Sequence, residues 1–210
     1  RLLGLAEEQG AKVFNKPNSI KEFNEKIFAI HFKEFIPKTL ITANIQKIIE
    51  FQVDQEIVIV KPLDGMGGTS IFKMEDMEDE NLDILLEMTN NEQTQIVVQE
   101  FLPEIFDGDF RILIIHGKPF NKTLARIPQG DSFKGNLAAG GKGVVKDITD
   151  TQKKIAEVIG KFLMTKGINF AGMDMIGDKL TEINITSPTC AREIFDQSGE
   201  NPISEYLKDL

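Results

Sequence analysis

Two carboxylates and one amide stand at spacings that suit a divalent cation. Asp174 lies in one alternating run of polar and apolar residues, Glu182 and Asn184 lie in the next, and residues 177–179 separate the runs. If residues 177–179 form a three-residue hairpin loop, Asp174 lies opposite Glu182, and Asn184 follows on the same face. Such oxygen ligands suit Mg²⁺, and metal ions bridged by phosphates in particular. The spacing therefore predicts a magnesium site.

An ordinary polar strand face exposed to solvent is the alternative for this hairpin. A two-residue turn would place Asp174 and Glu182 on opposite faces and would break the site. Ile183 and Ile185 alternate with the polar residues and are expected to point into the core. Neither run contains a His or Cys that would suggest zinc.

A glycine-rich loop follows residues 57–60, a β-branched run that is expected to be a fully buried strand ending at Lys61. Gly65, Gly67 and Gly68 allow close approach of the backbone to a ligand, and the exposed N–H groups of such a loop bind anions. The loop is not a Walker A motif, because no Gly-Lys-Ser/Thr sequence follows it, and it is not a dinucleotide fingerprint, because a strand and not a helix is expected after it. It is similar to the flap that covers ATP in kinases, and a plain glycine-rich hairpin is the alternative.

Other residues are candidates for the rest of a nucleotide. Residues 97–103 run from a buried strand into a connection between two lobes, and backbone groups of residues 100–102 are candidates for an adenine edge. Asp109 is a candidate for a ribose and Arg111 for a phosphate. Alternatively, the Asp-Gly-Asp sequence at 107–109 is simply a turn.

The segment after Arg126 is typical of a mobile lid, since residues 130–143 contain five glycines. Arg126, Lys134 and Lys142 are candidates for binding an anionic substrate or intermediate. A reactive acyl phosphate must be shielded from water, and lids provide that shield. An ordinary flexible loop is the alternative.

A helix is expected to start at Ser187, where free N–H groups would bind a carboxylate. Routine capping by Thr186 or Ser187 is the alternative. Cys190 is interpreted as a packed helix residue rather than a nucleophile, since His31 and His116 show no pairing with it.

The elements that must position these residues form two α+β lobes rather than a doubly wound sheet, with helices on one side of the strands. Ser19 and Glu22 match a capping box at the start of a helix. Helices are predicted at residues 2–9, 19–32, 44–51, 81–89 and 151–166, and strands at 13–14, 39–42, 57–60, 70–74, 95–99, 110–115, 122–126, 170–176 and 180–185. Residues 130–143 are expected to form no regular element.

The composition narrows the class of partner. The net charge of −9 and the pI of about 4.9 argue against a nucleic-acid partner, although a local basic cluster can still bind a small anion. The apolar runs are too short to cross a bilayer, and no secretory leader is recognisable. The single cysteine cannot form an intramolecular disulfide, which fits a reducing compartment such as the cytoplasm.

Several segments together resemble the bacterial glutathione synthetase family of the ATP-grasp superfamily. They are residues 15–17, 24–28, 59–72, 124–130, 135–141 and 181–189, so the resemblance extends over almost the whole chain. The lid and residues 184–189 are specific to the family, whereas the lysine–glycine loop and the metal residues are shared more widely. The resemblance implies two α+β lobes that hold ATP between them.

The resemblance also implies roles for individual residues. Lys26 and Lys61 would contact the ATP phosphates, and the covering loop would contain Gly65, Gly67, Gly68 and Ser70. The adenine site would be lined by Gln99, Glu100, Phe101 and Leu102, and Asp109 would contact the ribose. Mg²⁺, or Mn²⁺, would be held as two ions by Asp174, Glu182 and Asn184, with Glu182 bridging them. Arg111 and Arg126 would stabilise the phosphoryl group and the acyl phosphate, and substrate would contact Arg126, Asn136, Ser187 and Thr189. Glu100 stands where the family often has Asn, which leaves its contact with adenine open.

The activity implied by the resemblance is the ATP-dependent joining of γ-glutamylcysteine to glycine, giving glutathione, ADP and phosphate in a cytoplasmic homo-oligomer, a tetramer in the family. The family has an N-terminal domain before the two lobes. Residues 1–19 are expected to be its tail, residues 20–100 the first lobe, and residues 101–210 the second lobe with a lid at 127–143.

Two other functions stay open. One is a related carboxylate–amine ligase with another amino-acid or peptide substrate, which the lid residues disfavour. The other is a nucleotide-binding module without catalysis, which the presence of Lys61 and the metal residues disfavours. A protein kinase is disfavoured because no His-Arg-Asp catalytic loop is present.

Overall fold

The computed structural model describes residues 1–65, 68 and 70–208, and the chain divides into two compact units. Unit 1 comprises residues 1–35 and 104–210, and unit 2 comprises residues 36–103. Both units contain an antiparallel sheet with helices, which confirms the predicted α+β class. The observed division differs from the expected one at residues 101–103, which belong to unit 2, and at residues 20–35. Residues 20–35 belong to unit 1 because helix α3 (Glu25–Phe28) and the 3₁₀ turn η1 (Ala29–Phe32) pack on strand β9 (Lys179–Asn184).

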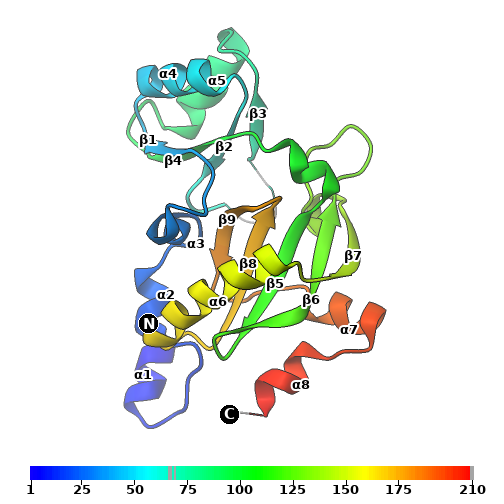
Figure 1. Ribbon diagram of the computed structural model, residues 1–210. Coiled ribbons are helices and arrows are strands. Elements are labelled where there is room, and N and C mark those ends of the chain that lie inside the picture. The colour runs from blue at the N-terminus through cyan, green and yellow to red at the C-terminus, as the bar shows by residue number, and fades with distance from the viewer. Residues whose placement is uncertain (66–67, 69, 209–210) are drawn as a thin grey trace. The chain divides into compact units, whose positions relative to one another are not determined.

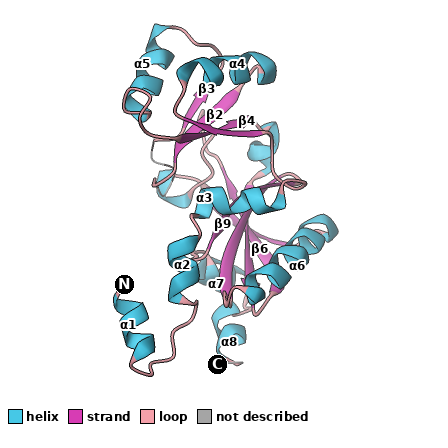
Figure 2. Ribbon diagram, turned by 90° about the vertical axis from the view of Figure 1, so that its left-hand side faces the viewer, coloured by secondary structure: helices cyan, strands magenta, loops and turns pink. Residues whose placement is uncertain are grey.

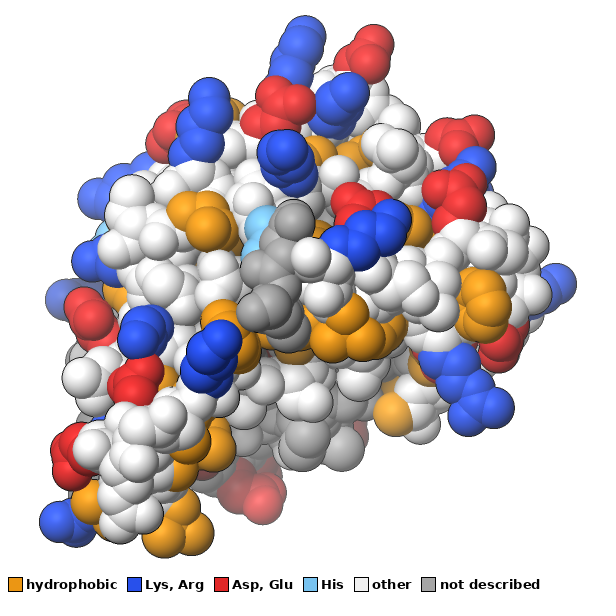
Figure 3. All heavy atoms as spheres, turned by 90° about the horizontal axis from the view of Figure 1, so that it is seen from below, with side chains coloured by type: hydrophobic (Ala, Val, Ile, Leu, Met, Phe, Trp, Pro, Cys, Tyr) orange, Lys and Arg blue, Asp and Glu red, His pale blue; other side chains and the backbone are white. Residues whose placement is uncertain are grey.

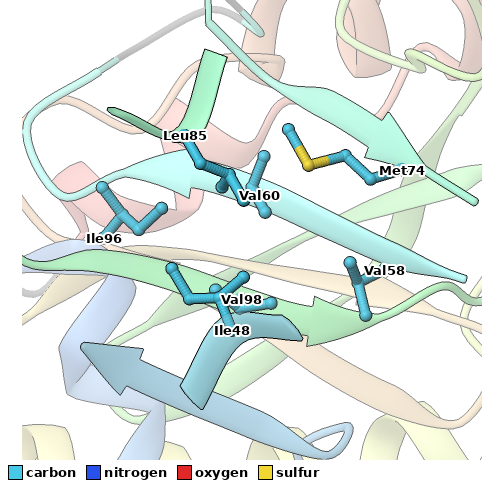
Figure 4. Packing of buried hydrophobic residues seen from close by; sticks show 7 residues of the cluster. All are labelled: Ile48, Val58, Val60, Met74, Leu85, Ile96 and Val98. Atoms are coloured by element: carbon cyan, nitrogen blue, oxygen red, sulfur yellow. The ribbon is translucent and has the colours of Figure 1, made fainter. Parts of the chain in front are cut away.

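Unit 2 contains a four-stranded sheet and two helices. The strand order is β1-β4-β2-β3, and the elements are β1 (Thr39–Thr42), α4 (Ile45–Gln55), β2 (Val58–Pro62), β3 (Phe72–Met74), α5 (Asp79–Met88) and β4 (Ile96–Glu100). Figure 4 shows its fully buried core, formed by Ile48, Val58, Val60, Met74, Leu85, Ile96 and Val98. Ile57 and Ile59 are only half-buried, so the prediction that residues 57–60 are fully buried is wrong. Helices α4 and α5 pack on one face of the antiparallel sheet, so only every second residue of a strand is fully buried.

Unit 1 contains a five-stranded antiparallel sheet with the order β7-β6-β5-β8-β9 (Figure 1). Its elements are η2 (Pro103–Asp107), β5 (Asp109–Ile115), β6 (Lys118–Ile127), η3 (Leu137–Ala139), β7 (Lys142–Asp147), α6 (Asp150–Thr165), β8 (Phe170–Ile176), β9, α7 (Ala191–Ser198) and α8 (Pro202–Leu207). Helix α6 contacts β5 and β6, and α7 contacts β6 and β7. Strand β7 was not predicted, since residues 142–147 lack polar–apolar alternation and become a strand by pairing with β6.

The β8–β9 hairpin has the expected pairing with an unexpected turn. Ile176 pairs with Lys179, so the loop has two residues and not three, and the predicted loop length is wrong. A register shift next to Asp174 restores the alignment, and Asp174 lies opposite Glu182 as predicted. Ile183 and Ile185 are fully buried, which confirms that they point into the core.

The N-terminal segment is divided into more and shorter helices than predicted. Helix α1 spans Leu2–Glu8, α2 spans Pro17–Glu22, and α3 follows after Phe23, where the backbone is extended. The prediction of one helix over 19–32 capped by Ser19 is therefore wrong. Pro17 starts α2 because its fixed φ suits the first helical position, and the Ser19 hydroxyl donates to the carbonyl of Lys166. Helix α3 lies beside β9 (Figures 1 and 2).

Acidic and basic side chains are interspersed over the face that Figure 3 shows. Helix α1 buries none of its residues, and Leu2 is 82% exposed. Within the residues that the structure describes, no helix has both the length and the apolar character that a membrane-spanning segment requires.

Asn15 connects the N-terminal segment to the β8–β9 hairpin. Its Nδ2 donates to the carbonyl oxygens of Phe170 at 2.7 Å and Ile185 at 2.8 Å. Its Oδ1 accepts from the N–H groups of Asn169 at 2.7 Å and Phe170 at 2.9 Å. Because Asn15 is buried, its removal would leave four backbone groups without partners.

We expect Asn15→Ala to lower the free energy of unfolding by about 2 kcal/mol, since several backbone groups lose buried hydrogen bonds. Urea unfolding followed by circular dichroism measures the change. Asn18→Ala is the matched control, because Asn18 is exposed and its side chain accepts a hydrogen bond from the exposed Lys21 side chain. Equal losses in the two variants would contradict the connecting role of Asn15.

Candidate functional site

The predicted metal residues and arginines gather on one face of the unit 1 sheet. Strand pairing aligns Arg111 of β5 with Asp174 of β8, and Asp174 with Glu182 of β9. Paired residues of antiparallel strands point to the same face. The same register adds Asp109, Arg126 and Asn184 to this face. The sheet therefore brings together residues that are up to 75 positions apart in the sequence.

Arg111 and Asp174 form a two-pronged ion pair at the centre of this cluster. Arg111 Nη2 donates to Asp174 Oδ2 at 2.8 Å, and Arg111 Nε donates to Asp174 Oδ1. The two side chains are only 6% and 4% exposed. Gly172 makes room for this pair, because a Cβ there would lie 2.9 Å from Arg111 Cδ and 3.0 Å from Pro188 Cβ. The sequence reasoning missed this glycine, although a glycine inside a strand signals close approach.

Arg126 joins a second carboxylate to the cluster. Its Nη2 lies 2.6 Å from Asp109 Oδ2 and 3.1 Å from Asp174 Oδ2, and its Nε donates to the backbone oxygen of Asp109 at 3.2 Å. The remaining oxygen of Asp109, Oδ1, is buried without a hydrogen-bond partner among the described residues. Two guanidinium groups and two carboxylates thus share one buried face.

Burial and charge set the protonation states in this cluster. Burial acts to raise the pKa of Asp174, but Arg111 and Arg126 outweigh it and lower the pKa to about 2. Burial raises the pKa of Asp109, and the Arg126 charge offsets this only in part. Burial acts to lower the pKa of both arginines, and Asp174 and Asp109 outweigh it. At neutral pH, Asp174 is an anion between two cations.

The donor set at Asp174, Glu182 and Asn184 fits a hard divalent cation. Two carboxylates and an amide supply oxygen atoms on one sheet face, and Asp174 is ionised. Asn184 Nδ2 donates to Asp174 Oδ2 at 3.2 Å, while the Glu182 side chain is 24% exposed. Among the described residues, no group of three or more His, Cys, Asp or Glu side chains is arranged to hold a metal ion.

Lys26 lies next to this donor set. Its Nζ is 3.7 Å from Glu182 Oε1, and its side chain is 8% exposed. The neighbouring Glu25 carboxylate accepts from the N–H of Thr186 at 3.4 Å. Helix α3 therefore contacts β9 through Lys26 and the segment after β9 through Glu25, and β9 carries two of the three proposed metal ligands.

In unit 2, Lys61 and Gln99 share the sheet face opposite the hydrophobic core. Ile59 pairs with Gln99, and Lys61 lies two residues after Ile59 on the same strand. Lys61 is buried, and Gln99 Nε2 donates to the Thr39 hydroxyl at 2.9 Å. A buried ammonium at the end of β2, before the glycine loop, agrees with the position that the sequence pattern predicts for it.

Part of the backbone of the segment predicted to bind adenine is hydrogen-bonded within unit 2. The N–H of Glu100 donates to the Lys38 carbonyl, and the N–H of Phe101 donates to the Ile57 carbonyl. The Glu100 carboxylate accepts from the N–H of Lys38 at 2.9 Å. The N–H groups of Glu100 and Phe101 are therefore already used in hydrogen bonds within unit 2.

The glycine loop shows the backbone freedom that the sequence suggests. Gly68 has φ of +81°, and Ser70 has φ of +56°, both in the left-handed region. Gly65 precedes them in the loop, and the predicted Gly67 lies outside the described residues.

The segment predicted as a lid is folded back on β6. Gly135 lies so close to the backbone oxygen of Arg126 that a side chain there would collide with it. The Asn136 carbonyl accepts from the N–H groups of Ala139 at 2.9 Å and Gly141 at 3.1 Å, around the turn η3. The expectation of no regular element is correct for residues 130–136, but not for the turn or for the start of β7.

The segment from Ser187 to Cys190 reaches the cluster through Thr189. Arg111 Nη1 donates to the Thr189 hydroxyl at 3.3 Å. The predicted helix start at Ser187 is wrong, because α7 begins at Ala191 and its N-cap residue, Cys190, has φ of +83° and no side-chain cap. Cys190 is 4% exposed, and burial raises the pKa of its thiol, which agrees with a packed residue rather than a nucleophile.

Comparison with known proteins adds sequence evidence to this geometry. Residues 25–199 match the family model described as prokaryotic glutathione synthetase, ATP-grasp domain. The glutathione synthetase of Vibrio parahaemolyticus is 48% identical over 99% of this chain and 66% of its own length. That of Shewanella oneidensis is 48% identical over 92% of this chain and 61% of its own length. The chain thus spans somewhat less than two thirds of these relatives.

Solved structures support the fold. The ATP-grasp ligase PsnB, complexed with a minimal precursor, Mg and ADP, matches with a TM-score of 0.68 and 18% identity, over 97% of this chain and 63% of that one. A RiPP-associated ATP-grasp ligase from Chryseobacterium gregarium matches with a TM-score of 0.71 and 20% identity, over 99% of this chain and 65% of that one. At such identities the likeness shows the ATP-grasp fold alone.

Proposed function

The chain belongs to the prokaryotic glutathione synthetase family, in its ATP-grasp domain, and on that basis we propose that the full-length protein joins γ-glutamylcysteine to glycine with conversion of ATP to ADP and phosphate. The observation that carries the proposal is the 48% identity to glutathione synthetases over almost the whole chain. The buried charge cluster around Asp174 supports it, because transfer of a phosphoryl group requires cations and oxygen ligands at fixed positions.

In the proposed reaction, the cysteine carboxylate of γ-glutamylcysteine attacks the γ-phosphate of ATP, which forms an acyl phosphate and releases ADP. Magnesium bound by Asp174, Glu182 and Asn184 would supply neutralisation of the phosphate charge. Arg126 holds its charge in place through Asp109 and Asp174, so it needs no reorganisation to stabilise an anion. Lys61, buried at the end of β2, would bind an ATP phosphate on the family resemblance.

In the second step, the amine of glycine attacks the acyl phosphate and phosphate leaves. No side chain acts as a nucleophile, because positioning and electrostatics are sufficient for both steps. The residues that we assign to the substrate are Arg126, Asn136, Ser187 and Thr189, supported by the contact of Thr189 with Arg111. We assign adenine to Gln99–Leu102, the ribose to Asp109 and the triphosphate cover to residues 65–70, on the family resemblance.

Further details rest on the same resemblance. We propose Mg²⁺ or Mn²⁺ as the metal, with two ions bridged by Glu182, whose partly exposed carboxylate has an oxygen facing Lys26. We also propose that the full-length protein is a cytoplasmic homo-oligomer. Sedimentation of the full-length protein would measure the number of subunits.

The test is ADP formation by the full-length protein with γ-glutamylcysteine, glycine and Mg²⁺. We expect ADP release that requires both substrates and the metal, together with glutathione as the product. ADP release only with a different amine or peptide would favour a related carboxylate–amine ligase. Calorimetric binding of Mg-ATP without substrate-dependent ADP release would favour a nucleotide-binding module.

A further inference from the structure

The donors of Arg111 are directed at two different parts of the site. Nε and Nη2 grip the two oxygens of Asp174, and Nη1 donates to Thr189, 78 residues further along the chain. The Thr123 hydroxyl donates to the backbone carbonyl of Arg111 at 2.8 Å, and Gly172 leaves space for the Arg111 side chain. With its side chain 6% exposed, Arg111 is placed inside the sheet face rather than at its surface.

This grip leaves the two oxygens of Asp174 unequal. Oδ2 accepts from Arg111 Nη2 at 2.8 Å and from Asn184 Nδ2 at 3.2 Å, which uses both of its lone pairs, and Arg126 Nη2 lies 3.1 Å away as an ion-pair partner. Within the described part of the chain, Oδ1 receives only Arg111 Nε. Oδ1 therefore keeps one lone pair, and the fork of Arg111 prevents the carboxylate from rotating to exchange the two oxygens.

We propose that Arg111 is a positioning residue, which selects Oδ1 of Asp174 as the metal-binding oxygen and couples it to the 186–190 segment through Thr189. The proposal rests on the proposed function only for the identity of the metal ligands. It differs from the role that the family resemblance suggests for Arg111, which is direct contact with the transferring phosphoryl group. Hydrogen-bond partners that orient metal ligands typically change metal affinity tenfold or more when they are replaced.

If Arg111 acted only through its charge, its removal would strengthen metal binding instead of weakening it. A guanidinium next to a metal ligand repels a divalent cation, so a variant without the charge would gain affinity on that account. Arg111→Lys separates the two effects, because lysine keeps the charge and cannot form a two-pronged pair. We expect this variant of the full-length protein to bind Mn²⁺ about tenfold more weakly in the presence of saturating ADP, measured by the loss of the free-ion electron paramagnetic resonance signal.

Arg192→Lys is the matched control for this measurement. Arg192 forms an exposed ion pair with Asp196 at 3.6 Å, with the arginine side chain 89% exposed, and we expect wild-type Mn²⁺ affinity for the Arg192→Lys variant. Circular dichroism of both variants confirms folding. A lower melting temperature in Arg111→Lys with unchanged Mn²⁺ affinity would show a structural role only and would overturn the proposal.

Thr189→Val tests the coupling and removes only the hydroxyl that Arg111 contacts. We expect it to weaken Mn²⁺ binding about threefold by itself, and to have no further effect in the Arg111→Lys background, because the coupled donor is already gone. If the Mn²⁺ affinity of the double variant fell by the product of the two single-variant effects, the proposed coupling would be overturned. If Arg111→Lys fails to fold, the Thr189→Val variant is sufficient as a test, because wild-type Mn²⁺ affinity in that variant would overturn the proposal.

The measurement also separates this proposal from the proposed function. Lack of ADP release with γ-glutamylcysteine and glycine in a wild-type protein that binds Mn²⁺ would overturn the proposed reaction and leave the role of Arg111 intact. Normal ADP release together with wild-type Mn²⁺ affinity in both variants would overturn the role of Arg111 alone.

Discussion

Glu182→Gln in the full-length protein is expected to lower magnesium-dependent ADP formation by more than about a hundredfold, since even indirect partners of a metal ligand contribute tenfold to a hundredfold. Glu182 lies opposite Asp174 on the strand that also carries Asn184. Glutamine keeps the size of the side chain and removes one negative charge from the donor set. Steady-state rates as a function of Mg²⁺ concentration measure the effect.

The control for this variant is Glu157→Gln on α6, an exposed carboxylate outside the charge cluster. We expect its rate to equal that of the wild type. Wild-type rates in Glu182→Gln at every Mg²⁺ concentration would rule out the assignment of Glu182 to the metal. A partial loss that high Mg²⁺ restores would support it, because the defect would then lie in metal affinity.

Asp174→Asn is expected to destabilise the protein by about 3 to 5 kcal/mol, the usual result of removing one partner from a buried ion pair. Arg111 and Arg126 both use Asp174 as a partner, and all three side chains are at most 6% exposed. Asparagine would leave two buried guanidinium groups with Asp109 as the one remaining carboxylate of the four-residue cluster. Urea unfolding in the absence of metal and nucleotide measures the loss.

The loss should depend on pH in a defined direction. The folded state lowers the pKa of Asp174 from 3.8 to about 2, so its contribution is present above pH 4 and declines as the pH falls towards 2. The difference in stability between wild type and Asp174→Asn should therefore shrink over that window. A difference that stays constant down to pH 2 would contradict the ion-pair account.

Asp147→Asn is the matched control for the stability measurement. Asp147 pairs with Lys122 at the surface, with its side chain 83% exposed, and water screens such pairs strongly. We expect little change in the free energy of unfolding for this variant. A loss as large as that of Asp174→Asn would show that burial is not the source of the effect.

Local sequence patterns were sufficient for much of the fold. The alternation in residues 170–176 and 180–185 correctly predicts two strands with Asp174 opposite Glu182. The predicted helix starts were less reliable. Ser19 lies inside α2, Ser187 lies before α7, and neither residue caps the helix. Proline at position 17 and a left-handed Cys190 decided those helix starts instead.

The hairpin illustrates how a wrong detail can leave a correct site. The sequence suggested a three-residue loop, and the structure has a two-residue turn followed by a register shift beside Asp174. The two differences cancel, so the metal residues still share a face. No local pattern distinguishes these arrangements, because both bury Ile183 and place Gly177 and Asp178 in the turn.

The amino-acid sequence by itself determined the residue types available for chemistry, the faces on which they lie, and the family to which the chain belongs. Only the tertiary structure decided which charges meet. Arg111 is 63 positions from Asp174 and 78 from Thr189, and Asn15 is 155 from Phe170. Such partners are set by the order of strands in the sheet, which results from packing of the whole chain and not from periodicity within any one segment.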